Sequence, residues 1–122
     1  MAPVRPVTVL AVDDQEIFRR AARSLIAATP GFEQVGEAAS GAEALELAEK
    51  LRPALVLLDV RMPGMDGIET ACRLAEADHS MLVVLTSIEE VPELPSSGVD
   101  AYLRKQDLTP GALREIWDAH VR

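Results

Sequence analysis

Short apolar runs alternate along this chain with amphipathic segments. The three strongest runs are nearly continuous, which is typical of strands buried on both faces of a parallel sheet. They cover Val7–Val12, Ala54–Leu58 and Met81–Leu85, and two weaker candidates cover Phe32–Glu37 and Ala101–Leu103. The pattern therefore predicts five strands.

Helical periodicity and helix-start signals occupy the segments between these strands. Ser40 and Glu43 have the spacing of a capping box, and Pro110 suits the first position of a helix because the N–H it lacks has no partner there. The predicted helices run from Glu16 to Ala28, from Ser40 to about Leu51, from Asp66 to about Asp78, and from Thr109 onward. Strands that alternate with helices in this way predict a doubly wound α/β domain with right-handed connections.

Length and composition narrow the possibilities. The 122 residues suffice for one domain, which we expect to span residues 1–122. A net charge of −8 argues against direct nucleic-acid binding by this chain, because such binding draws on surplus Lys and Arg. No apolar run approaches the roughly 20 residues of a membrane span, and the N-terminus lacks a signal-peptide pattern. We therefore expect a cytoplasmic chain that does not enter a membrane.

Polar residues follow four of the five predicted strands. Asp13 and Asp14 come after the first strand, Asp59 after the third, Thr86 after the fourth and Lys105 after the fifth. Ligands of an open parallel sheet bind beyond the carboxyl ends of its strands. We therefore expect these five side chains to converge at one edge of the sheet.

The chemistry of this set points to phosphoryl transfer. Three clustered carboxylates repel one another unless a cation is present, and Mg²⁺ prefers oxygen ligands of this kind. Lys105 supplies a compact positive charge suited to a phosphoryl oxygen. A carboxylate beside these cations is a competent nucleophile, because phosphoryl transfer needs mainly positioning and charge neutralisation.

Each residue also has a simpler interpretation. Asp13 and Asp14 could cap the first helix, Thr86 could cap another, and a Lys after a strand is usually solvated. An enzyme of the haloacid-dehalogenase type is disfavoured, because its motif requires a second Asp two residues after the nucleophile, where this chain has Gln15 and Glu16. The order of the five residues, each at a strand end, favours one shared site.

The sequence resembles the response-regulator receiver domains of two-component systems over essentially its whole length. The matching stretches are VLAVDDQ, LVLLDVRMPGMDGIE, VVLTS and AYLRK, and DVRMPGMDG is the most specific. The DVRMPGMDG stretch resembles that of the receiver subgroup whose members carry a C-terminal helix-turn-helix. The resemblance implies a (βα)5 flavodoxin-like sandwich with strand order 2-1-3-4-5.

The resemblance also implies a role for each site residue. Asp59 would accept a phosphoryl group from a sensor histidine kinase, with Lys105 and Thr86 binding that group. Asp14 and Asp59 would ligate Mg²⁺ directly, Asp13 would hold it through water, and the backbone carbonyl of Arg61 would be a further ligand. Thr86 and Tyr102 would form the conformational switch.

The implied function is a phosphorylation-dependent signalling switch, which regulates transcription through an output domain outside this chain. This role is compatible with homodimer formation. Beyond its own phosphotransfer and autodephosphorylation, such a chain is not an enzyme. The alternative is a pseudo-receiver that acts as a protein-interaction module without phosphorylation.

Two departures from the family change the structural expectations. The stretch between Thr86 and Lys105 is a few residues short and contains Pro95, and a proline inside a helix costs about 3 kcal/mol. We therefore expect a shortened or missing fourth helix. Gln106 follows Lys105 where many members have a proline after a cis peptide bond, and we expect a cis bond here as well.

Overall fold

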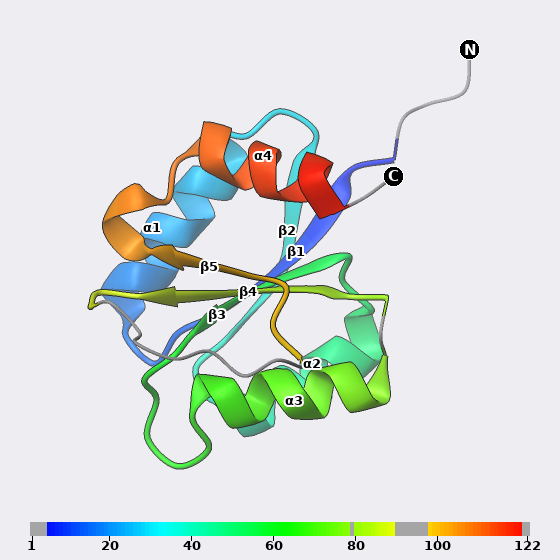
Figure 1. Ribbon diagram of the computed structural model, residues 1–122, viewed down its shortest axis with the longest axis vertical. Helices are drawn as coiled ribbons and strands as arrows, with labels where there is room; N and C mark the ends of the chain where they lie inside the picture. The colour runs from blue at the N-terminus through cyan, green and yellow to red at the C-terminus, as the bar shows by residue number, and fades with distance from the viewer. Residues whose placement is uncertain (1–4, 79, 90–97, 121–122) are drawn as a thin grey trace.

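The computed structural model describes residues 5–78, 80–89 and 98–120. Five parallel strands form one sheet in the order β2-β1-β3-β4-β5, between two layers of helices (Figure 1). The strands are β1 (Val7–Val12), β2 (Phe32–Ala38), β3 (Leu55–Asp59), β4 (Leu82–Ser87) and β5 (Ala101–Arg104). The helices are α1 (Glu16–Ala27), α2 (Gly41–Leu51), α3 (Gly67–Ala77) and α4 (Pro110–His120), with a 3-10 turn at Lys105–Asp107. The predicted fold class and strand order are confirmed.

Strand boundaries match the apolar runs to within one or two residues, and two strands extend into the polar residues that follow the run. The sequence pattern ended the third strand at Leu58 and the fourth at Leu85. In the structure β3 includes Asp59 and β4 extends to Ser87, because Asp59 still pairs in register with Thr86. Hydropathy alone misses these positions because a carboxylate and a hydroxyl mark the end of an apolar run.

The core consists of two aliphatic clusters, one on each face of the sheet. Val9, Leu57 and Val84 belong to the cluster that packs against α1 and α4. Leu10 and Leu85 point to the opposite face, which α2 and α3 cover. Figure 1 shows the same arrangement, with α1 and α4 above the sheet and α2 and α3 below it. This burial on both faces explains why the strands read as continuous apolar runs.

Helix starts follow the predicted caps. The Ser40 hydroxyl accepts a hydrogen bond from the Glu43 N–H at 3.1 Å, and the Glu43 carboxylate accepts one from the Ala39 N–H at 2.6 Å. Asp66 accepts from the Glu69 N–H at 2.9 Å and so caps α3. These bonds satisfy N–H groups that have no partner within the helix.

The connection from β4 to β5 agrees with the expected shortening of the fourth helix. Residues 88–89 and 98–100 are in no helix, and residues 90–97 lie outside the described residues. The described parts of the chain hold four α-helices. Gly98, with φ +86°, lies directly on α3, where an added Cβ would be 3.0 Å from the Ala71 carbonyl oxygen and the Cys72 Cα. Val99 then packs against the core on the α2 and α3 face.

The expected cis bond after Lys105 is wrong. No peptide bond among the described residues is cis, so Lys105–Gln106 is trans. A cis bond before a residue other than proline costs about 3–4 kcal/mol. The chain instead enters a 3-10 turn at Lys105–Asp107. No helix in the described residues is long and apolar enough to cross a membrane.

Gly67 allows α3 to start directly against the end of β3. Its N–H donates to the Val60 carbonyl oxygen at 2.8 Å. A Cβ at this position would overlap the Asp59 carbonyl oxygen and lie 2.8 Å from the Val60 Cα. Because these are backbone atoms, they could not yield without moving Asp59.

We expect Gly67→Ala to lower the free energy of unfolding by about 1–3 kcal/mol, since the added methyl forces a backbone shift. Gly111→Ala is the matched control, because its Cβ would meet only the Thr109 hydroxyl at 4.0 Å. Alanine suits a helix better than glycine, so this variant should be neutral or stabilised by up to about 1 kcal/mol. Urea denaturation of both variants measures the difference, and equal stabilities would contradict the steric argument.

Candidate phosphoryl-transfer site

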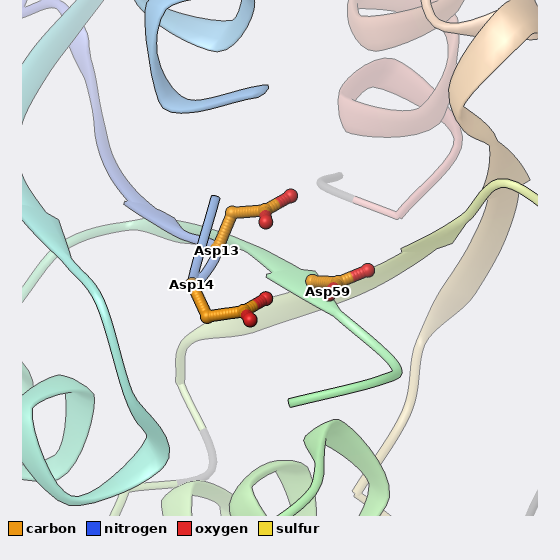
Figure 2. A group of neighbouring side chains, drawn as sticks. All are labelled: Asp13, Asp14 and Asp59. Atoms are coloured by element: carbon orange, nitrogen blue, oxygen red, sulfur yellow. The ribbon is translucent and has the colours of Figure 1, made fainter. Parts of the chain in front are cut away.

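Three carboxylates meet at the carboxyl edge of the sheet. Asp13 and Asp14 follow β1, and Asp59 ends the neighbouring strand β3. One oxygen from each lies within 4.8 Å of the others, and Figure 2 shows the three side chains extending into the same space. The predicted convergence of these residues is therefore found in the structure.

Lys105 places its ammonium within this cluster. Its Nζ lies 2.5 Å from Asp13 Oδ2 and 3.3 Å from Asp59 Oδ1. The three side chains are only 13%, 9% and 8% exposed, so water screens these ion pairs poorly. One ammonium thus pairs with two of the three carboxylates, and the site retains an excess of negative charge.

The environment of Asp59 disfavours its ionised form. Burial raises the pKa of this carboxyl from 3.8 to about 6, and the negative charge of Asp13 adds to the rise. The charge and hydrogen bond of Lys105 act in the opposite direction without cancelling it. An additional cation would restore the carboxylate, which is the form that acts as a nucleophile.

Asp14 has an open coordination position. It is partly exposed, but its Oδ1 atom is buried and has no hydrogen-bond partner. A buried carboxylate oxygen without a partner is costly, and a bound hard cation would satisfy it. The carboxylate oxygens of this cluster therefore fit a hard cation such as Mg²⁺.

Thr86 and Tyr102 lie on the adjacent strands β4 and β5. Thr86 is 5% exposed and pairs in register with Asp59. Tyr102 is half-buried against the core on the α2 and α3 face, and its hydroxyl donates to the Glu89 carbonyl oxygen at 2.7 Å. The side chain of Glu89 also pairs with Arg61 at 3.1 Å. The ion pair between Arg61 and Glu89 therefore joins the loop that follows β3 to the loop that follows β4.

The structure adds two residues of α1 that the sequence did not single out. The Arg19 guanidinium donates to the Asp13 carbonyl oxygen at 2.8 Å, and the Phe18 ring lies 3.6 Å from Lys105 Nζ, measured to the ring centroid. Phe18 is one of only two phenylalanines, and it falls within the first turn of the helix after the aspartates. Its contact joins residues far apart in the sequence, so helical periodicity could not reveal it.

Comparison with known proteins identifies the class. Residues 9–116 match the sequence profile of the family described as "Response regulator receiver domain", so this chain belongs to that family. Receiver domains bind Mg²⁺ at an acidic pocket, and this chain has the cluster of Asp13, Asp14 and Asp59.

Individual relatives are response regulators. It is 40% identical over 114 residues to the nitrate/nitrite response regulator NarL of Escherichia coli, covering 90% of this chain and 52% of that protein. It is 38% identical over 119 residues to NarP of the same organism, covering 94% and 55%. The chain thus spans about half the length of these relatives.

A solved structure shares the fold closely. The signal receiver domain of the response regulator NarL from Mycobacterium tuberculosis superposes with a TM-score of 0.82 at 31% sequence identity, covering 94% of this chain and 96% of that one. The similarity extends over nearly the whole sheet and its helices.

The raised pKa of Asp59 makes stability depend on pH. Because the folded protein binds the Asp59 proton more tightly than the unfolded chain does, protonation of Asp59 contributes to the stability of the fold. This contribution is fully present below pH 3.8 and is lost as the pH rises through about 6. In EDTA above pH 6, Asp59→Asn should be more stable than wild type by up to about 3 kcal/mol, and the gap should close towards pH 4.

Urea denaturation at several pH values measures this gap. The control is Asp118→Asn, which removes a carboxylate that is 61% exposed and should give no comparable gap. An Asp59→Asn variant that is no more stable than wild type at pH 8 would refute the electrostatic argument.

Proposed function

We propose that this chain is a phosphorylation-dependent switch that accepts a phosphoryl group on Asp59 from a sensor histidine kinase. The observation that carries the proposal is the position of the Asp59 carboxylate, which is buried beside the Lys105 ammonium and two further carboxylates. Membership of the receiver family supports the same assignment.

The transfer needs little covalent chemistry from the protein. An Asp59 carboxylate oxygen forms a bond to phosphorus while the phosphorus–nitrogen bond of the phosphohistidine breaks, and the histidine ring nitrogen keeps the electron pair. The Lys105 ammonium pairs with a phosphoryl oxygen as negative charge accumulates. Asp14 and Asp59 would hold Mg²⁺ directly, Asp13 would hold it through water, and Arg61 would hold it through its backbone carbonyl. When bound there, the ion would supply positive charge for the phosphoryl oxygens.

Thr86 and Tyr102 carry the signal from the phosphorylated site. The phosphoryl group offers Thr86 a charge-assisted hydrogen bond, and its move towards Asp59 changes the space available to the Tyr102 ring. The bond from the Tyr102 hydroxyl to the Glu89 carbonyl joins that ring to the loop after β4. This loop is the element whose conformation we expect phosphorylation to bias.

The output lies outside this chain. NarL and NarP are nitrate/nitrite response regulators about twice as long as the matched region. We infer that this cytoplasmic receiver controls transcription through a separate output domain and does not contact nucleic acid itself, in keeping with its net charge of −8. Homodimer formation, which is frequent among response regulators, fits this role.

A pseudo-receiver is the second candidate. The observation in its favour is the connection between β4 and β5, whose described residues, 88–89 and 98–100, are in no helix. A chain of this kind would signal through protein contacts alone. Phosphorylation chemistry separates the two candidates.

Incubation with Mg²⁺ and acetyl phosphate should add one phosphoryl group to the wild type, detected by intact-protein mass spectrometry. Asp59→Ala should remove the adduct, and EDTA should prevent it. Asp118→Asn, which removes an exposed carboxylate of α4, should be phosphorylated like the wild type. If the wild type gains no adduct and binds no beryllofluoride, the pseudo-receiver is favoured.

Mg²⁺ should raise the melting temperature of the wild type, because an ion that binds only the folded state stabilises it. Asp14→Asn should abolish most of this shift, since it removes charge from the carboxylate with the unpartnered oxygen. Glu16→Gln, at an exposed position two residues away, should retain the shift. Equal shifts in the two variants would exclude Asp14 as a ligand. Differential scanning fluorimetry suffices for the measurement.

A further inference from the structure

The Phe18 ring lies against the ammonium of the proposed site. Phe18 belongs to the first turn of α1, and its ring centroid is 3.6 Å from Lys105 Nζ. A cation over the face of an aromatic ring is attracted by the ring quadrupole, and the attraction strengthens where water is excluded. The Lys105 side chain is 13% exposed, so water is largely excluded here.

The other contacts of Lys105 do not by themselves direct its ammonium to Asp59. Nζ is closer to Asp13 Oδ2, at 2.5 Å, than to Asp59 Oδ1, at 3.3 Å. The lysine stem is flexible, and Lys105 begins the 3-10 turn directly after β5, a four-residue strand whose residues are all only half-buried. The position of Nζ therefore depends on the groups around it, and the Phe18 ring is an uncharged group among them.

A cavity lies beside the Phe18 ring, so the size of this side chain affects how much water can reach Lys105. The cavity has a volume of about 390 Å³, and its lining includes Phe18, Ala22, Leu25, Lys105 and Leu108. Because Lys105 already lines this cavity, a smaller side chain in place of the ring would enlarge it beside the lysine and admit water to the ammonium. Water at Nζ would screen the pairs with the two carboxylates.

We propose that Phe18 is a positioning residue for Lys105, whose ammonium it holds beside the carboxylate that accepts the phosphoryl group. The inference rests on the proposed function, because positioning matters only if Asp59 is phosphorylated. It requires a ring face at residue 18, and apolar volume alone does not fulfil the role.

The test compares phosphorylation rates with acetyl phosphate and Mg²⁺ in four proteins. Phe18→Leu should be phosphorylated about 3- to 30-fold more slowly than wild type, the range that loss of a cation–π contact gives. Phe18→Tyr keeps the ring face and should retain most of the rate.

The matched control is Phe32→Leu at the chain's other phenylalanine. Phe32 is 8% exposed and packs edge-on against Trp117, away from the carboxylates. This variant should lose stability yet keep the wild-type rate. Circular dichroism checks that each protein is folded, and Phe18→Met replaces Phe18→Leu if the latter folds poorly.

A double-mutant cycle separates positioning from a general structural effect. In a Lys105→Met background, Phe18→Leu should cause no further loss of rate, because the group that it positions is absent. An equal loss in both backgrounds would overturn the proposal, as would a Phe18→Leu rate equal to wild type. If the wild type itself were not phosphorylated, the proposed function would fail and the inference with it. A phosphorylated wild type with an unaffected Phe18→Leu variant would remove the inference alone.

Discussion

Repulsion between carboxylates at the carboxyl edge of the sheet is the constraint to which the site is adapted. β1 and β3 are paired at the centre of the sheet, so the aspartates that follow and end them cannot move apart. Lys105, which directly follows the edge strand β5, offsets part of this repulsion. The pKa of Asp59 nevertheless remains raised to about 6. The uncompensated charge makes the site receptive to a divalent cation.

The aliphatic core provides the rigidity that holds these charges together. The strands that carry the carboxylates are buried on both faces, and Gly67 lets α3 approach the end of β3 so closely that no other residue fits without a shift. Charge at the edge therefore costs stability that packing in the centre must supply. Proteins commonly accept local destabilisation of this kind at functional sites.

Contacts at the mouth of the site join elements that are separate in the sequence. Glu89 accepts the Tyr102 hydroxyl bond through its carbonyl and pairs with Arg61 through its carboxylate. The Arg61 pair is exposed and contributes little energy by itself. Its significance is geometric, because a change beside Asp59 can reach the Tyr102 ring through one residue. On the opposite side, Arg19 and Phe18 hold Asp13 and Lys105 from α1.

The sequence by itself determined the order of strands and helices, the caps at Ser40 and Asp66, and the five polar residues at the strand ends. Local periodicity and capping chemistry depend on neighbouring residues, so a linear pattern is sufficient to read them. Only the tertiary structure decided which groups surround Lys105, that Tyr102 bonds to Glu89, and that the Lys105–Gln106 bond is trans. These features depend on side-chain directions and distances between remote segments, and the spacing of residues along a chain does not specify them.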